Sequence, residues 1–274
     1  MDDIGRAISV PRRPARIVSL VPSLTDLCFA LGAGQRVVGI TDFCVEPAGK
    51  LDGITRVGGE KRPSIDVIRG LAPDLVLANK EENRRQDVDR LADSGIPVHV
   101  SYPRTVAEGA KLCVDVADLL SAGSRGVALA ARIRKASAEA RRAGIREADG
   151  VPAVVLIWKD PMMTISGDTY GHDVLACLGG RNLYAQSIQR YPKVTLSAIA
   201  RLAPRLILLP DEPYDFTAED AAEVGRAVPG AVVVRCPGRA FFWHGPRAVE
   251  ISALARLVAD AFTSTDRGAR QGPR

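Results

Sequence analysis

The chain has 274 residues, of which 46% are hydrophobic, 25% charged and 5% aromatic. This length and composition are typical of a soluble globular protein with one large domain or two smaller ones. The net charge of +5 is mild, and no basic run is interleaved with aromatic residues, so the composition argues against a nucleic-acid-binding protein.

No two of the five cysteines have the C-x-x-C spacing of a redox or zinc motif: Cys28, Cys44, Cys113, Cys177 and Cys236. We therefore expect neither a disulfide framework nor a zinc knuckle. Residues 1–16 lack the continuous apolar core of a signal peptide, and no apolar run is long enough to span a bilayer. As written, the sequence predicts a cytoplasmic protein without membrane insertion, or a periplasmic or extracellular one if a signal peptide was removed.

Residues 1–104 are predicted to form an N-terminal α/β lobe. Short apolar runs of the kind found in buried parallel strands occur at residues 16–21, 37–41, 74–78 and 98–101. Helical patterns lie between these runs, and Ser23 and Ser64 are placed to cap two of the helices. Polar loops follow the strands, among them residues 42–47 and 79–83.

Residues 105–149 are predicted to connect this lobe to a second one. Leu112, Val116 and Leu120 recur at helical spacing in a segment rich in Ala, Arg, Lys and Glu, which are good helix formers. Gly123 interrupts the pattern, so we expect a shorter helix, a break, and a long backbone helix from about residue 125 to residue 146. A helix of about twenty residues spans ~30 Å, enough to join two lobes rigidly.

Residues 150–264 are predicted to form a C-terminal α/β lobe of the same design. Strands are expected at residues 153–157, 206–208 and 232–235, and helices at 172–178, 195–201 and 246–262. Residues 158–170 are expected to be a long loop. Residues 265–274 are expected to be a disordered tail.

The two predicted lobes share a sequence repeat. Leu71-Ala72-Pro73-Asp74-Leu75-Val76-Leu77 recurs as Leu202-Ala203-Pro204-Arg205-Leu206-Ile207-Leu208. Each copy follows a short capped helix and precedes an acidic polar loop. The Leu-Gly-Ala-Gly helix end at residues 31–34 is likewise echoed by Leu-Gly-Gly at 178–180. Two matches in the same order indicate a pair of pseudo-repeated lobes.

The loops after the predicted strands hold both tryptophans and most of the histidines. In open parallel sheets, ligands bind beyond the carboxyl ends of the strands, and grooves between domains are favoured ligand sites. We therefore expect these loops to line one cleft between the lobes. The side chains expected to bind a ligand there are Cys44, Glu60, Lys61, Lys80, Glu81, Trp158, Tyr170, Asp211, Tyr214, Phe242, Trp243, His244 and Arg247.

The opening RIVSLVPSLTD at residues 16–26, the APDLV strand entry at 72–76 and the interlobe helix resemble those of class III solute-binding proteins. These are the helical-backbone receptors for vitamin B12, haem and ferric siderophores. The resemblance covers about residues 16–261. It implies two Rossmann-like α/β lobes with parallel sheets joined by a long backbone α-helix, and one ligand held between them with little hinge motion.

Three further segments are similar to those of a cobalamin- or metal-receptor-like branch that often lacks a signal peptide: NKEENR at 79–84, DEPY at 211–214 and WHGPR at 243–247. That branch often has His where this chain has Glu46. The resemblance also implies an ABC permease as partner, because the B12 receptor docks through one acidic residue in each lobe. Asp66 fits the first docking position, whereas Ser197 occupies the second.

Four chemical alternatives remain open. Cys44, Glu46 and His244 are candidate ligands for a metal bound directly by the protein. A preformed metal complex, such as cobalamin or another corrinoid, haem or a chelated metal, needs only aromatic walls and hydrogen bonds. An enzyme would use Cys44 as nucleophile with His244 or His172 as base, although no standard catalytic motif is present. A module with this fold that binds no small molecule is the fourth.

We predict from these observations a cytoplasmic, monomeric, two-lobed receptor that binds one small ligand between its lobes. The expected ligand is a metal complex, and the expected role is that of an ABC-transporter-type solute-binding protein. A cytoplasmic enzyme with Cys44 and His244 in its cleft is the alternative.

Overall fold

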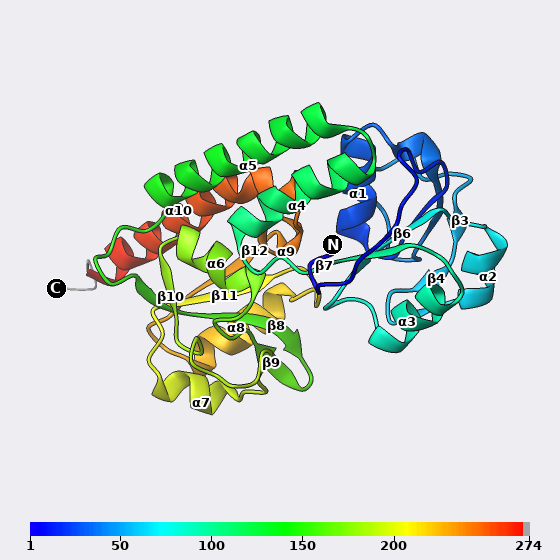
Figure 1. Cartoon of the computed structure of the whole chain (residues 1–274). Helices are drawn as coiled ribbons and strands as arrows, with labels where there is room; N and C mark the ends of the chain where they lie inside the picture. Colours follow the sequence, from blue (N-terminus) through cyan, green and yellow to red (C-terminus); the bar gives the residue numbers. More distant parts are fainter. Residues whose placement is uncertain (271–274) are drawn as a thin grey trace. The chain divides into compact units, whose positions relative to one another are not determined.

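The computed structural model describes the backbone of residues 1–270 and the side chains of residues 1–264. Contacts divide the chain into two compact units, each with its own sheet and its own hydrophobic core (Figure 1). The first unit comprises Met1–Pro103, Ala107–Arg132 and His244–Pro246. The second comprises Arg104–Val106, Ile133–Trp243 and the chain from Arg247 onward. Among the described residues, no helix is both long enough and apolar enough to cross a membrane.

The first unit is built on a five-stranded parallel sheet with the order β3-β2-β1-β6-β7. Its strands are β1 (Ile17–Ser19), β2 (Val37–Ile40), β3 (Thr55–Arg56), β6 (Leu75–Asn79) and β7 (Val98–Ser101). A short antiparallel hairpin of β4 (Gly58–Gly59) and β5 (Arg62–Pro63) follows β3 in the chain. Because the sheet is parallel, all its strands end at the same edge, where the polar loops begin.

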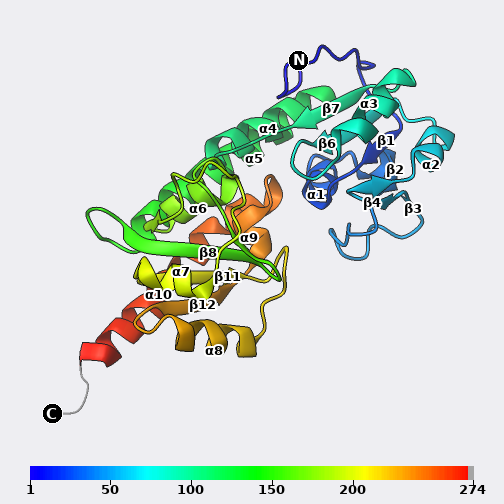
Figure 2. The same cartoon turned by 90° about the horizontal axis from the view of Figure 1, so that it is seen from below.

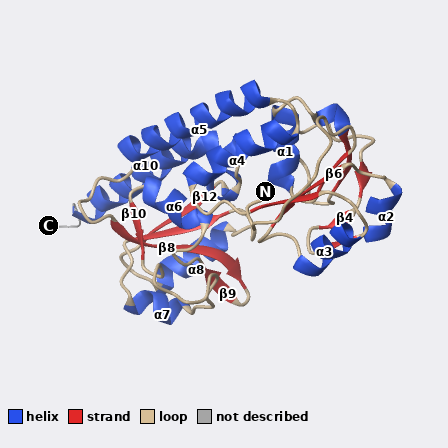
Figure 3. Ribbon diagram, viewed as in Figure 1, coloured by secondary structure: helices blue, strands red, loops and turns tan. Residues whose placement is uncertain are grey.

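The helices of the first unit cover both faces of this sheet. They are α1 (Pro22–Ala30), the short 3₁₀ helix η1 (Gly34–Arg36), α2 (Ile65–Gly70), α3 (Arg85–Asp93) and α4 (Val106–Leu119). On one face, α2 and α3 bury apolar side chains against Val18, Val76 and Val98, while α1 lies on the other (Figure 3). Burial of such aliphatic side chains contributes about 1.5–3 kcal/mol each.

The two predicted caps of the first unit had different outcomes. Ser64 caps α2 as expected, since its hydroxyl accepts a hydrogen bond from the Val67 N–H at 3.4 Å. The prediction for Ser23 was wrong. Pro22 occupies the first helical turn of α1, Val21 is the N-cap, and Ser23 is buried inside the helix. Proline fixes the backbone angle that a first turn requires, so α1 begins two residues earlier than a Ser23 cap would place it.

The middle of the chain forms the two predicted helices. The first, α4, ends at Leu119, and α5 (Gly123–Ala143) follows it. The break between them is centred on Ser121, which has a left-handed φ of +53°. The residues of α5 belong to both units, with the change between Arg132 and Ile133.

The second unit contains a parallel sheet with the order β10-β8-β11-β12. Its strands are β8 (Val151–Lys159), β10 (Gly180–Asn182), β11 (Leu206–Pro210) and β12 (Val232–Cys236), and β9 (Met162–Thr164) pairs antiparallel with β8. The prediction of a loop from residue 158 was therefore wrong at its start. Trp158 lies on β8, because pairing with β9 extends that strand beyond its apolar run.

The helices of the second unit also form two layers. They are α6 (Tyr170–Cys177), α7 (Leu196–Arg201), α8 (Ala218–Ala227), α9 (Gly238–Phe242), the 3₁₀ helix η2 (Pro246–Glu250) and α10 (Ile251–Arg270). On one face of the sheet, α7 and α8 pack against Val154, Leu156 and Ile207, and α6, α9 and α10 lie on the other (Figure 2). The helix α10 continues to Arg270, into the segment for which a disordered tail is predicted, and residues 271–274 lie outside the described part of the chain. The physical reason is the amphipathic spacing of Leu254, Val258 and Phe262, which are buried and carry the helix forward.

The predicted fold class is confirmed: two Rossmann-like α/β lobes with parallel sheets, joined in sequence by a long helix. The repeat also has a structural reason. In both copies the alanine that follows the helix, Ala72 after α2 and Ala203 after α7, has a left-handed φ, +44° and +47° respectively. Each turn ends a short helix and sends the chain into a strand that pairs with the first strand of its unit, β6 with β1 and β11 with β8.

Replacement of Ala203 by glycine is expected to stabilise the protein by about 0.5 kcal/mol. Glycine reaches positive φ without the steric cost of a Cβ, about 1–2 kcal/mol, and this gain exceeds its additional unfolded-state entropy. Urea denaturation measures the difference. The matched control is Ala200→Gly within α7, which is expected to destabilise by about 1 kcal/mol. Destabilisation by Ala203→Gly would contradict this account.

Candidate ligand-binding surfaces

In the first unit, a polar network fixes the loop after β6. The Asn83 side chain accepts from the Asn79 N–H (2.8 Å) and donates to the carbonyl oxygens of Leu20 (3.2 Å) and Glu60 (3.1 Å). Asn79 in turn donates to the Ser101 hydroxyl at 3.2 Å and accepts from the Glu81 N–H at 2.8 Å. This network ties together the ends of β1, β6 and β7 and the β4–β5 hairpin.

Two lysines lie on the surface that this network supports. Lys61 donates to the Glu81 carbonyl oxygen, and the Lys80 ammonium lies 4.0 Å from the centroid of the Tyr102 ring. Glu60 and Glu81, the sequence neighbours of Lys61 and Lys80, are half-buried. Burial also raises the pKa of Glu82, more than the Lys61 charge lowers it. Of the predicted site residues, Glu60, Lys61, Lys80 and Glu81 are thus brought to one edge of the first sheet.

An exposed phenylalanine outside the predicted set of site residues lies on the loop after β2. The Phe43 side chain is 62% exposed, and its neighbour Val45 is also exposed. A Cβ added to Gly59 would lie 3.4 Å from the Phe43 ring, so the ring lies against the hairpin that carries Glu60 and Lys61. Its position directly after a buried strand was the sequence signal for this residue.

The predicted metal ligands of the first unit do not form a metal site. Cys44 is fully buried between the hydroxyls of Thr25 (3.1 Å) and Thr41 (3.2 Å). Glu46 accepts from the Ala48 N–H, and His244 is buried. Among the described residues, no three His, Cys, Asp or Glu side chains form a group that could hold a metal ion. The short loop around Cys44 folds inward and places the thiol in the core instead.

The geometry also disfavours Cys44 as a nucleophile. Burial raises the pKa of its thiol more than the two threonine hydroxyls lower it. The hydrogen-bond partners of the sulfur are threonines and not the predicted base His244. The other four cysteines are buried as well, and burial raises the pKa of Cys28, Cys113 and Cys236 to about 12.

We therefore expect native protein at neutral pH to react slowly with iodoacetamide at all five cysteines. The thiolate is the reactive form, and burial both suppresses it and blocks access. Mass spectrometry of the alkylated protein measures the reaction, with guanidinium-denatured protein as the control in which every cysteine is modified. Rapid single modification of Cys44 in native protein would contradict this expectation and restore the enzyme hypothesis.

In the second unit, an aromatic cluster lies beside the carboxyl ends of β8 and β11. The Trp158 ring is 41% exposed and meets the Tyr214 ring edge to face, with centroids 5.7 Å apart. Tyr214 packs in the same manner on the buried Phe216 at 4.8 Å. The Trp158 indole N–H donates to the Asp160 carbonyl oxygen at 3.0 Å, which fixes the exposed ring.

A second tryptophan of this unit is held by a carboxylate. Glu212 accepts from the indole N–H of Trp243 at 2.8 Å and from the Arg239 guanidinium at 3.2 Å. Arg239 also lies 5.5 Å from the Trp243 ring centroid. Glu212 and Arg239 were not among the predicted site residues, although Glu212 lies in the loop after β11 and Arg239 lies three residues after β12. The neighbouring Asp211 is exposed, and its carboxylate accepts from the Gly238 N–H at 2.6 Å.

Three other predicted residues of the second unit have mainly structural contacts. Tyr170 is only 3% exposed, because it forms the first turn of α6. Phe242 packs edge to face on the buried Phe241 with centroids 4.9 Å apart. Arg247 forms an ion pair with Glu250 at 3.2 Å.

Each unit therefore presents an exposed aromatic side chain with charged groups at the carboxyl edge of its sheet. Such surfaces suit a ligand with an apolar body and a polar rim. A model of the family described as periplasmic binding protein matches residues 17–226. The chain belongs to the periplasmic binding protein family.

Relatives and solved structures agree with this membership. The chain is 25% identical over 194 residues to the vitamin B12-binding protein of Vibrio parahaemolyticus, covering 70% of this chain and 69% of that protein. The periplasmic vitamin B12 binding protein BtuF of Vibrio cholerae superposes with a TM-score of 0.79 at 19% identity, covering 92% of this chain and 99% of that one. The apo haem-binding protein RhuT from Roseiflexus sp. RS-1 superposes with a TM-score of 0.76 at 22% identity. The match covers 90% of this chain and 98% of that one. The fold of this protein is accordingly that of the class III periplasmic binding proteins.

Proposed function

We propose that this protein binds a corrinoid or haem-like metal complex through the carboxyl edges of its sheets and presents it to an ABC permease. The observation that carries the proposal is the pair of exposed aromatic side chains, Phe43 and Trp158, each at the carboxyl edge of a parallel sheet. The relatives named for vitamin B12 and haem support the same class of ligand.

Corrin and porphyrin rings are broad and flat, with apolar faces and a rim of amide or carboxylate groups. Aromatic side chains pack on such faces, and lysine or arginine side chains pair with carboxylates or a phosphate at the rim. In the first unit, Lys61 and Lys80 are exposed on the surface that also presents Phe43. In the second unit, Arg239 and Arg247 lie close in sequence to Trp243. A complex that brings its own metal requires no metal-binding cluster from the protein.

The permease part of the proposal rests on Asp66. This carboxylate is exposed on α2 in the first unit, while the repeat places the exposed Ser197 on α7 of the second. Cell fractionation separates two versions of the proposal. If the protein is exported, the result supports delivery of the ligand to an importer. If it is found in the cytoplasm, the proposal is reduced to ligand binding without delivery to a permease.

A fluorescence titration tests the proposal directly. The chain contains two tryptophans, Trp158 and Trp243, and both belong to the candidate surface of the second unit. Cyanocobalamin and haemin absorb in the range of tryptophan emission, so we expect bound ligand to quench the emission with a saturable, one-to-one titration. Calorimetry checks the stoichiometry. The proposal fails if neither ligand produces saturable quenching or heat.

Replacement of Trp158 by alanine is expected to weaken binding of the preferred ligand about tenfold without unfolding the protein. The reason is the loss of a large exposed ring from the binding surface. The matched control is Leu257→Ala on α10, because Leu257 has the same exposed fraction of 41%. Equal affinity of Trp158→Ala, Trp243→Ala and the control would place the ligand elsewhere.

A further inference from the structure

The N-terminal arm, which we define as residues 1–12, runs along the edge strand β7 of the first unit. The Asp3 N–H donates to the Val100 carbonyl oxygen at 3.1 Å, and the Asp3 carboxylate accepts from the Tyr102 N–H at 2.8 Å. Arg6 donates to the Val98 carbonyl oxygen at 3.2 Å. At its far end, the Arg12 carbonyl oxygen accepts from the Ser121 hydroxyl at 2.5 Å. The arm is thus fastened to β7 and to the end of α4.

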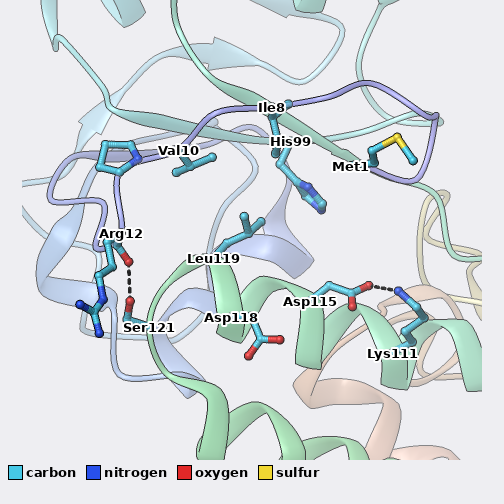
Figure 4. A pocket seen from close by; sticks show the side chains of 11 residues that line it. Met1, Ile8, Val10, Arg12, His99, Lys111, Asp115, Asp118, Leu119 and Ser121 are labelled. Carbon is cyan, nitrogen blue, oxygen red and sulfur yellow. Dashed lines mark hydrogen bonds and ion pairs between the residues drawn. The ribbon is translucent and has the colours of Figure 1, made fainter.

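A cavity of about 630 Å³ lies between this arm, β7 and α4 (Figure 4). Its volume falls within the range of about 300–1,000 Å³ that is usual for small-molecule sites. All the residues that line it belong to the first unit, so it does not depend on the second. None of them belongs to the candidate surfaces described above.

His99 points from β7 into this space, toward α4 (Figure 4). Its neighbours Val98 and Val100 face the α2–α3 side, so strand alternation turns His99 to the opposite face. The side chain is only 3% exposed, and no described residue forms a hydrogen bond with either ring nitrogen. Buried polar atoms are nearly always hydrogen-bonded. Two buried ring nitrogens without a partner are therefore unusual in the wall of a cavity.

The imidazole is neutral at pH 7. Burial lowers the pKa of His99, and this exceeds the opposing effect of the carboxylates of Asp2, Asp3 and Asp115. The N-terminal ammonium lowers it further. A neutral imidazole offers one donor and one acceptor, so its natural partner is a group that can do both, such as a hydroxyl or an amide.

The rest of the cavity wall is amphipathic and carries charges of both signs. Ile8, Val10 and Leu119 supply apolar surface from the arm and from α4. The charged side chains are Arg12, Lys111, Asp115 and Asp118, and Lys111 pairs with Asp115 at 2.5 Å. The side chains thus carry two positive and two negative charges, and the Met1 ammonium adds one more positive charge, so the wall is not dominated by charge of one sign.

We propose that this cavity is a second ligand site, for a neutral amphipathic organic molecule whose hydroxyl, amine or amide group hydrogen-bonds to His99. The apolar body of the molecule lies against Ile8, Val10 and Leu119. Both ring nitrogens are buried, so the ligand reaches them only when side chains around His99 rearrange. The site is independent of the corrinoid or haem site.

The probe for the test is N-phenyl-1-naphthylamine, a neutral aromatic amine that fluoresces strongly in apolar surroundings. Long-range proton–nitrogen NMR of protein labelled at its three histidines reports on the imidazoles. We expect saturable fluorescence and a shift of the His99 ring nitrogens at the same probe concentrations. Absence of saturable fluorescence, or saturation with unchanged His99 nitrogens, overturns the proposal.

Two variants locate the probe. Leu119→Trp fills the cavity from a half-exposed position and is expected to weaken probe binding at least about tenfold. His99→Phe keeps a ring but removes both nitrogens, and is expected to weaken probe binding about fivefold. If the phenylalanine variant does not fold, His99→Gln is used in its place. Trp158→Ala is the comparison for the other surface. If Trp158→Ala abolishes probe binding while Leu119→Trp does not, the proposal is overturned.

Discussion

Replacement of Asn83 by alanine is expected to lower the free energy of unfolding by about 3 kcal/mol. The substitution removes three hydrogen bonds of a buried side chain, to the Asn79 N–H and to the carbonyl oxygens of Leu20 and Glu60. Each buried backbone group left without a partner costs about 1–3 kcal/mol, and partial access of water keeps the total near the lower end. Urea denaturation followed by circular dichroism measures the effect.

The control for Asn83 is Gln86→Ala, three residues further along and exposed on α3. It removes a similar amide and is expected to change stability by less than about 0.5 kcal/mol. Because Asn83 supports the loop with Lys80 and Glu81, we also expect its loss to weaken ligand binding in protein that remains folded. A loss of stability no larger than that of the control would show that the network does not hold the edge of the sheet together.

Acidification is expected to destabilise the protein through His244. Burial lowers the pKa of this imidazole to about 4, despite the opposing charge of Glu81. The unfolded chain binds the proton near pH 6.5, whereas the folded protein resists it until about pH 4. The contribution of neutral His244 to the free energy of unfolding is fully present above pH 6.5. It is lost as the pH falls toward 4, by up to about 3 kcal/mol.

The measurement compares unfolding free energies of wild-type protein and His244→Gln between pH 7.5 and pH 4 in steps. Glutamine does not titrate, so the difference between the two proteins should shrink steadily as the pH falls. His99 has the same direction of shift and is present in both proteins, so its contribution cancels. A difference that is independent of pH would mean that His244 titrates alike in the folded and unfolded chains.

The elements of the fold were largely predictable from local sequence. Alternation of apolar runs with helical patterns predicted strands at β1, β2, β6, β7, β11 and β12, because parallel strands are buried on both faces and must be apolar. The Ser64 cap was equally local, since a hydroxyl reaches only the N–H groups of its own first turn. Errors arose where a distant partner or a neighbouring proline intervened, as with β9 beside Trp158 and Pro22 before Ser23.

The site residues were less predictable than the elements. The rule that loops follow strand ends brought Lys61, Lys80 and Glu81 to one edge, but it cannot say whether a loop side chain turns outward or inward. Cys44 and Tyr170 turned into the core, while Phe43 turned out. Glu212 holds the Trp243 indole and the Arg239 guanidinium by hydrogen bonds, and both of these residues lie on a different segment of the chain.

The sequence by itself determined the two α/β halves, the helix between them and the family, because these depend on periodicity and on short motifs that act within a few residues. Only the tertiary structure decided which polar side chains are exposed. It buried the Cys44 thiol between two threonines, tied three strand ends together through Asn83, and turned His99 toward a cavity beneath the N-terminal arm. Exposure depends on packing between distant segments, and no local pattern records it.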